Sequence, residues 1–141
     1  MSINKFNSEG YYDPTAYEAM TTVEKEEKAL RAFRPSVYIC SPYAGDVSKN
    51  VENARNYSRF AVDKGYIPVA PHLLFPQFLN DNNTKERQLG LFFGNAIMSK
   101  CSEVWVFGDR ISAGMEAEIK RAKWKNYRLR YFTETCEEVF K

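Results

Sequence analysis

The sequence predicts a small doubly wound α/β fold, in which a parallel sheet of about four strands carries helices on both faces. From residue 36 onward, short apolar runs alternate with amphipathic segments of helical length, an order typical of parallel strands joined by right-handed helical crossovers. The apolar runs are continuous, as expected for strands that are covered on both faces. The length of 141 residues fits one such domain.

The first 35 residues lie outside this alternating pattern. Residues 1–12 are polar and aromatic without a period, and we expect them to form an arm. Asp13 followed by Pro14 is typical of a helix start, and residues 15–34 carry the i,i+4 charge pairs of an exposed helix, which Pro35 ends. We therefore expect an N-terminal arm and helix over residues 1–35, and an α/β domain over residues 36–141.

The α/β domain is predicted to contain the following elements. Strands are expected at residues 37–40, 66–70, 104–107 and 129–132, and helices at residues 51–64, 84–99, 114–125 and 134–140. Pro68 favours an edge position for the second strand, because proline cannot donate to a neighbouring strand. Residues 71–83 form a long connection, and Thr84 is expected to cap the helix that follows. The strand order is expected to be flavodoxin-like, with the ligand site at the carboxyl ends of the strands.

Composition excludes several kinds of protein. The net charge of +2 gives no indication of a groove for a nucleic acid polymer. The three cysteines have no C-x-x-C spacing and the chain has one histidine, so we expect no metal site and no disulfide framework. No apolar run approaches the ~18 residues of a membrane span, and the N-terminus has no signal-peptide pattern. We expect a cytoplasmic protein with reduced thiols.

Polar residues follow three of the predicted strands, and these loops are expected to meet at one edge of the sheet. The first loop offers a hydroxyl, a phenol and a flexible turn, although an ordinary strand-to-helix turn is equally compatible with it. His72 follows the second strand and either contacts a ligand or orders its loop. Asp46 and Asp109 are loop acids whose default role is capping or solvation. The residues concerned are Ser41, Pro42, Tyr43, Gly45 and Asp46, then His72, then Gly108, Asp109 and Ser112.

The helix predicted from residue 84 brings Arg87, Gly94 and Asn95 along one side by steps of three or four residues. Arg87 either binds an anion or is a solvated arginine near a helix start. Asn95 lies among apolar residues, where an amide needs hydrogen-bond partners, and is a candidate to hold a sugar hydroxyl.

The third loop leads into a helix that carries a candidate catalytic carboxylate. Ser112 and the bare backbone N–H groups at this helix start suit a phosphate or another anion. Glu118 follows Gly114 by four residues, so that both lie about 40° apart on one helix face. A carboxylate held over such a pocket is a candidate nucleophile or general base. The alternative is an ordinary surface glutamate near a helix N-terminus.

Residues 36–132 resemble the nucleoside 2-deoxyribosyltransferase-like superfamily, and most closely its DUF4406-type group of small bacterial and phage domains. The resemblance is carried by residues 37–43, 71–72, 103–108 and 111–119, with Ser112, Gly114 and Glu118 at the spacing of that superfamily. It implies that Glu118 attacks the anomeric carbon of a deoxyribosyl unit. It also implies that Ser112 and neighbouring amides bind the 5′ hydroxyl or phosphate, and that Tyr43 lies beside the sugar or base.

Glu118, Asn95 and Tyr43 are accordingly the catalytic candidates. The substrate-binding candidates are Ser41, Pro42, Gly45, Asp46, His72, Arg87, Gly108, Asp109, Ser112, Gly114 and Met115. One departure from the superfamily concerns the helix before the third strand, where related enzymes usually carry an aspartate. Here the turn contains Asn95, which can hydrogen-bond but cannot be a general base.

The leading hypothesis is a hydrolase of nucleoside or nucleotide N-glycosidic bonds, or a 2-deoxyribosyltransferase, that uses a glutamate nucleophile and no metal or organic cofactor. Its partner is then a small nucleoside or nucleotide, and by analogy with related enzymes we expect a homo-oligomer. The missing aspartate favours an alternative, a nucleotide-binding protein that senses or sequesters its ligand without turnover. A scaffold with a vestigial pocket is a third possibility.

Overall fold

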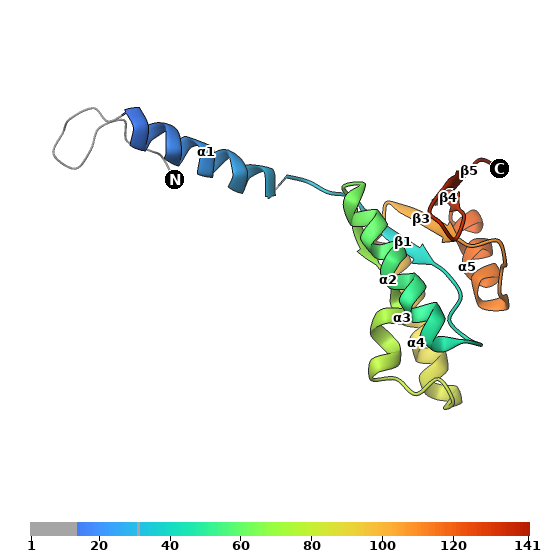
Figure 1. Cartoon of the computed structure of the whole chain (residues 1–141). Helices are drawn as coiled ribbons and strands as arrows, with labels where there is room; N and C mark the ends of the chain where they lie inside the picture. Colours follow the sequence, from blue (N-terminus) through green and yellow to red (C-terminus); the bar gives the residue numbers. More distant parts are fainter. Residues whose placement is uncertain (1–13, 31) are drawn as a thin grey trace. The chain divides into compact units, whose positions relative to one another are not determined.

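The computed structural model describes residues 14–30 and 32–141, which belong to two compact units, Met1–Phe33 and Arg34–Lys141. The first unit contains helix α1 (Pro14–Leu30), which ends earlier than the predicted residue 34 (Figure 1). The predicted arm over residues 1–12 and the cap at Asp13 lie outside the described residues. Within the described ranges, no helix combines the length and the apolar character needed to cross a bilayer.

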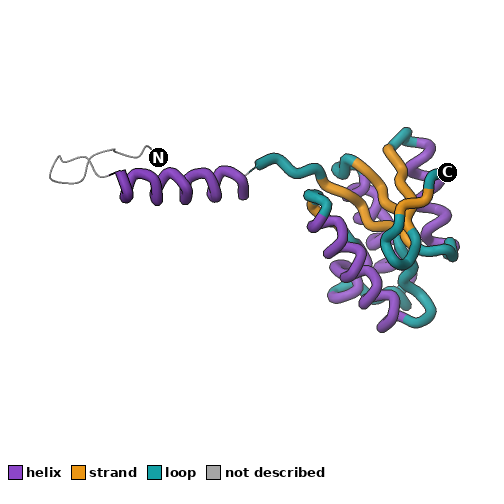
Figure 2. The backbone as a smooth tube through the Cα atoms, turned by 45° about the horizontal axis from the view of Figure 1, so that its top comes forward, coloured by secondary structure: helices purple, strands orange, loops and turns teal. Residues whose placement is uncertain are grey.

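The second unit contains the strands, drawn in orange in Figure 2. They form one sheet with the order β2-β1-β3-β4-β5. Its strands are β1 (Ser36–Cys40), β2 (Ile67–Val69), β3 (Glu103–Phe107), β4 (Arg128–Phe132) and β5 (Glu138–Val139). The first four pair in parallel, and β5 adds to β4 in the antiparallel direction. The predicted α/β class and the flavodoxin-like order are confirmed, and β2 lies at the edge where Pro68 favoured it.

Helices cover both faces of this sheet, because successive strand side chains point to opposite sides. On one face, helix α2 (Val47–Asp63) packs on Val37 and Ile39 of β1. On the other face, α4 (Thr84–Met98) and α5 (Ala113–Trp124) pack on Tyr38 and Cys40. Residues 104–107 of β3 are buried, as expected for a central strand with both faces covered.

Two parts of the chain before the central strand contain more helix than predicted. Helix α2 begins at Val47, because the Asp46 carboxylate accepts the Lys49 N–H and caps the helix at that point. The connection after β2 contains α3 (Pro71–Leu74) and a 3-10 turn, η1 (Phe75–Gln77), each with a proline in its first turn. Asn83, and not Thr84, caps α4 by accepting two backbone N–H groups.

The predicted helix over residues 134–140 is wrong, and a tight turn followed by β5 occupies this stretch. Cys136 has φ of 64°, a left-handed conformation that does not continue a helix. The Thr133 N–H donates to the Glu137 carbonyl at 2.8 Å, and the Glu137 N–H donates to the Thr133 hydroxyl at 3.1 Å. These bonds close the turn and return the chain to pair with β4.

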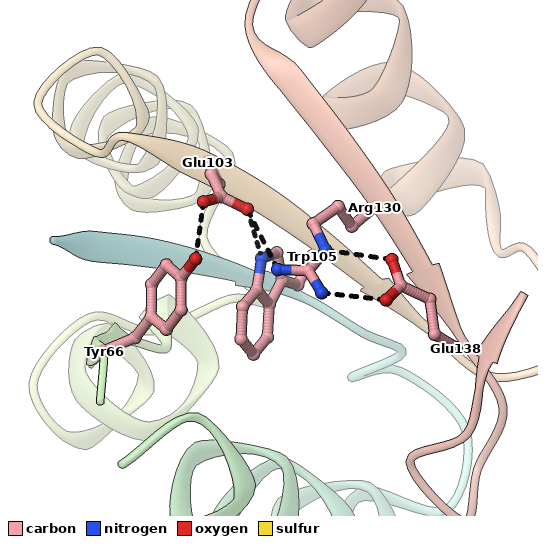
Figure 3. A network of polar contacts seen from close by, with 5 residues as sticks. All are labelled: Tyr66, Glu103, Trp105, Arg130 and Glu138. Carbon is pink, nitrogen blue, oxygen red and sulfur yellow. Dashed lines mark hydrogen bonds and ion pairs between the residues drawn. The ribbon is translucent and has the colours of Figure 1, made fainter. Parts of the chain in front are cut away.

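A polar network covers the α2 face of the sheet beside this turn (Figure 3). Arg130 donates to both carboxylate oxygens of Glu138, at 2.9 and 2.8 Å, and its guanidinium lies 5.0 Å from the Trp105 ring centroid. Glu103 is 7% exposed and accepts bonds from Trp105 at 3.0 Å and Tyr66 at 2.8 Å. The network shields the core where α2 does not reach, because Arg130 stacks over aromatic rings that β3 and β4 supply.

Candidate functional site

A cavity of about 190 Å³ lies beside the carboxyl ends of β1 and β2, where the fold predicts a ligand site. It is lined from several separate parts of the chain: β1 and its loop, the segment from α3 to residue 81, and the helices α4 and α5. The lining residues are Tyr38, Tyr43, Ala44, Pro71, His72, Phe75, Pro76, Leu79, Asp81, Glu86, Arg87, Gly90, Leu91, Gly94, Asn95 and Glu118.

Glu118 reaches this cavity from the middle of α5. Ser112 fixes the start of that helix, because its hydroxyl accepts the Met115 N–H at 3.2 Å. The Glu118 Oε2 atom is buried and has no hydrogen-bond partner within the protein. Burial raises the pKa of Glu118 to about 7, although a hydrogen bond with Tyr38 acts to lower it. Glu118 thus lines the cavity as a residue, and one of its carboxylate oxygens is buried without a partner that the protein supplies.

Tyr38 is a site residue that the sequence reading did not identify. It lies within β1, is 3% exposed, and turns its hydroxyl toward Glu118 on the α4 and α5 face. Burial and the nearby Glu118 charge raise the Tyr38 pKa far above its ordinary range, so this group is a hydrogen-bond donor and not a base. The sequence did contain one signal for Tyr38, because a tyrosine inside a buried strand needs a hydrogen-bond partner for its hydroxyl.

Two predicted residues of α4, Arg87 and Asn95, line the same cavity. Asn95 is half-buried, whereas Arg87 is exposed at the rim. Gly94 is buried beside Asn95, and a Cβ built on it would lie 3.4 Å from the Tyr38 hydroxyl oxygen. The absence of a side chain at Gly94 therefore lets α4 approach β1 and leaves the Tyr38 hydroxyl open to the cavity.

Two predicted residues from the first and second loops, Tyr43 and His72, form a stacked pair at the cavity wall. Their ring centroids lie 5.0 Å apart with an interplanar angle of 28°. Burial lowers the pKa of His72, against the opposing effects of a hydrogen bond to the Ser41 backbone carbonyl and of the Asp81 charge. The imidazole is therefore neutral at neutral pH.

The other predicted site residues lie outside the cavity lining. Ser41 and Met115 are buried, and the Ser41 hydroxyl has no partner within the protein. Asp46 and Ser112 cap α2 and α5. Gly45 and Gly108 adopt positive φ angles of 99° and 98° in their turns. Pro42, Asp109 and Gly114 do not line the cavity either. A substrate role for these nine residues stays a prediction.

An apolar wall and an acidic rim were also missed by the sequence reading. The wall consists of Phe75, Pro76, Leu79 and Leu91. The rim carries Asp81 and Glu86, and the Asn80 N–H donates to Glu86 Oε1 at 3.4 Å. Most of these residues belong to the connection that was predicted to lack regular structure. A proline-rich apolar segment after an edge strand was the available signal for a cavity wall.

The titratable groups of this site do not form a metal centre. Across the described ranges, no group of three or more His, Cys, Asp or Glu side chains is close enough to hold a metal ion. The cavity lining offers instead three carboxyl groups, two phenols, an amide, an imidazole and a guanidinium around an apolar wall. This set suits an organic ligand that carries hydroxyl groups and a flat ring.

The fold and this cavity define an α/β protein with a cavity at the carboxyl edge of a flavodoxin-like sheet. The chain belongs to the family described as a domain of unknown function, DUF7768, whose model matches residues 35–132. The expected DUF4406-type assignment stays a prediction. A comparison with curated proteins finds no match.

A solved 2-deoxyribosyltransferase from Bacillus psychrosaccharolyticus has a similar structure, with a TM-score of 0.60 and 13% sequence identity. The similarity covers 74% of this chain and 77% of that one. The relative is described as a biocatalyst for the synthesis of antiviral and antitumoral nucleosides. At this level of identity, the likeness confirms the deoxyribosyltransferase-like fold that the resemblance predicted.

Proposed function

We propose that the protein cleaves or transfers the N-glycosidic bond of a nucleoside or nucleotide, with Glu118 as the nucleophile. The observation that carries this proposal is Glu118 itself, which lines the cavity next to Tyr38 and has one buried carboxylate oxygen without a partner in the protein. The fold shared with a 2-deoxyribosyltransferase supports it.

The mechanism divides one substitution into two steps. In the first, a Glu118 oxygen bonds to the anomeric carbon while the bond from that carbon to the base nitrogen breaks, and the base leaves with its electron pair. In the second, water or another base attacks the same carbon and returns the electron pair of the ester bond to the carboxylate. A fixed carboxylate stabilises the oxocarbenium-like transition states of both steps.

The side chains around Glu118 supply the remaining requirements of this chemistry. The Tyr38 hydrogen bond opposes the effect of burial on the Glu118 pKa, and so keeps part of the carboxylate ionised at neutral pH. Asn95 is positioned to hold a sugar hydroxyl, and the ring of Tyr43 offers a surface for the sugar or base. The wall formed by Phe75, Pro76, Leu79 and Leu91 is apolar, which suits the faces of a nucleobase.

A panel of nucleosides, 2′-deoxynucleosides and their 5′-monophosphates tests the proposal. Free base is measured by chromatography for the wild type, for Glu118→Gln, and for the matched control Glu116→Gln on the exposed side of the same helix. We expect base release from the wild type and from Glu116→Gln, and a loss of at least about 10³-fold in Glu118→Gln. Equal activity of the two variants contradicts the nucleophile assignment.

The second candidate is a nucleotide-binding protein without turnover, and Asn95 favours it because this amide replaces the acid that related enzymes usually carry. The same panel separates the two functions when binding is measured by calorimetry. Saturable binding without base release from the wild type supports the sensor, whereas base release excludes it.

We propose further that the protein is a homo-oligomer in which a second copy covers the α4 side of the cavity. Phe78, Leu91 and Phe92 are 61%, 59% and 67% exposed there, and Leu91 also lines the cavity. Light scattering after size exclusion should give a multiple of the chain mass that falls to one chain in Phe92→Glu. The control Trp124→Glu alters a side chain that is 75% exposed on α5 and should leave the mass unchanged.

A further inference from the structure

His72 is held in the cavity by contacts on two sides. It is the second residue of α3, directly after the edge strand β2. The Tyr43 ring stacks on it with centroids 5.0 Å apart, and the Ser41 backbone carbonyl is close enough to act on its pKa. The imidazole plane is therefore fixed by groups that belong to the fold and not to a ligand.

This arrangement leaves the second ring nitrogen of His72 with a free lone pair. In a neutral imidazole one nitrogen carries the proton and the other accepts. The Ser41 carbonyl favours the tautomer whose N–H points toward it. Burial lowers the His72 pKa and keeps the ring neutral at neutral pH, against the smaller effects of the Ser41 bond and the Asp81 charge.

The other charged and titratable groups of the cavity are less suited to accept a proton from water. Glu118, from α5, bonds to the sugar in the proposed mechanism, and the Tyr38 phenol stays protonated because burial raises its pKa. Asp81 and Arg87 are exposed at the rim, and Glu86 accepts the Asn80 N–H. Asn95 has no basicity.

We propose that His72 is the general base of the second step and takes a proton from the water molecule that hydrolyses the sugar ester of Glu118. This inference rests on the proposed function. The water oxygen bonds to the anomeric carbon while the bond from that carbon to the Glu118 oxygen breaks. The electron pair of the broken bond returns to the carboxylate, and the proton passes to the free nitrogen of His72 and then to solvent.

The test measures the burst and the steady phase of base release, with an excess of the 2′-deoxynucleoside that the wild type cleaves fastest. In His72→Gln the side-chain amide can still donate to the Ser41 carbonyl but cannot act as a base. We expect a burst of about one free base per protein chain, then steady turnover about 10²-fold to 10⁴-fold slower than in the wild type. Intact-mass spectrometry should detect the sugar on the protein, and peptide mapping should locate it at Glu118.

A second variant, His72→Gly, keeps the inference testable if the glutamine is poorly accommodated. Added imidazole should restore its steady turnover and should leave the burst unchanged, because only the second step lacks a base. A wild-type turnover rate in His72→Gln overturns the inference, and so does an equal loss of burst and steady rate, which indicates a structural role. If the wild type itself releases no base, the proposed function fails and this inference fails with it.

Discussion

At the scale of single residues, Tyr38 and Glu118 control one another's ionisation. Burial raises the Glu118 pKa to about 7, and the Tyr38 hydrogen bond acts against that rise. The Glu118 charge in turn adds to the effect of burial on Tyr38 and keeps its phenol protonated. The pair therefore holds a carboxylate that is partly ionised at neutral pH inside an otherwise apolar layer, as nucleophilic sites require.

The first prediction concerns the pH dependence of activity. Tyr38→Phe removes the bond that stabilises the ionised carboxylate, so the Glu118 pKa should rise above about 7. Because the nucleophile must be ionised, the acid limb of the kcat/KM profile should move to higher pH. Tyr66→Phe is the matched control, since that hydroxyl bonds to Glu103 and does not line the cavity. An unmoved acid limb in Tyr38→Phe would show that Tyr38 does not set this charge.

The second prediction concerns stability. A carboxyl group whose pKa rises from 4.5 to about 7 on folding contributes stability below pH 4.5 that is lost as the pH rises through 7. Glu118→Gln has no such loss, so it should be more stable than the wild type at pH 8, by about 2 kcal/mol after allowance for partial exposure. The advantage should shrink at pH 5. Denaturant unfolding at pH 8 and pH 5 measures the stability of Glu118→Gln relative to the wild type. An equal stability difference at the two pH values would count against the raised Glu118 pKa.

At the scale of elements, the strand-and-helix order from residue 36 to 132 could be predicted because apolar runs and amphipathic segments have different periods. The end of the chain could not. Residues 134–140 are rich in glutamate and read as a helix, but Cys136 in a left-handed conformation and the contact of Glu138 with Arg130 give β5 instead. The first cause is a backbone conformation that is uncommon for a residue other than glycine, and the second is a contact between strands, so the local sequence pattern indicates neither.

The candidate site also contains some residues that the sequence predicted and others that it did not. Glu118, Asn95, Arg87, Tyr43 and His72 were expected together because they follow strands or lie on helices that meet at one sheet edge. Tyr38 was missed because an aromatic inside a strand is usually part of the core. The aromatic and acidic residues between β2 and α4 were missed because no periodic signal marks a cavity wall.

The third prediction tests the polar network in Figure 3 as a substitute for a covering helix. Arg130→Met keeps much of the side-chain volume but leaves Glu103 and Glu138 without their shared cation. We expect a loss of about 2 kcal/mol in the free energy of unfolding, as for hydrogen bonds to partly buried charges, and a rise in Trp105 exposure measured by fluorescence quenching. Arg59→Met, at an exposed i,i+4 pair, is the control and should change little.

The acid sensitivity of this network has a definite sign. The Arg130 hydrogen bonds lower the pKa of Glu138, and the bonds to Glu103 lower its pKa despite the opposing effect of burial. Both carboxylates therefore contribute stability above about pH 4.5 that is lost as the pH falls. The difference in the free energy of unfolding between the wild type and Arg130→Met should become smaller below pH 4. A difference that widens in acid would contradict the assignment.

At the scale of the whole molecule, the residues that form the sheet, both core layers and the cavity all belong to the unit Arg34–Lys141. We propose that this unit is the functional domain and that the N-terminal helix is a separate element. The separation agrees with the family match, which begins at residue 35.

The fourth prediction follows from that division. A chain that begins at Arg34 should fold with the thermal midpoint of the full chain to within about 4 °C, the shift that about 1 kcal/mol produces in a domain of this size. It should also keep its base-release activity. Calorimetry and the nucleoside panel measure the two properties. A cooperative transition lost on truncation would mean that residues before 34 are part of the domain's core.

Gly94 gives the spacing between one helix and one strand a chemical meaning. A single methyl at this position would touch the phenol oxygen of Tyr38, the group that acts to lower the Glu118 pKa. A substitution at Gly94 therefore changes the surroundings of Tyr38 and leaves the Glu118 side chain itself unaltered. The spacing between α4 and β1 is thus a means of changing reactivity that keeps the side chains of the proposed mechanism.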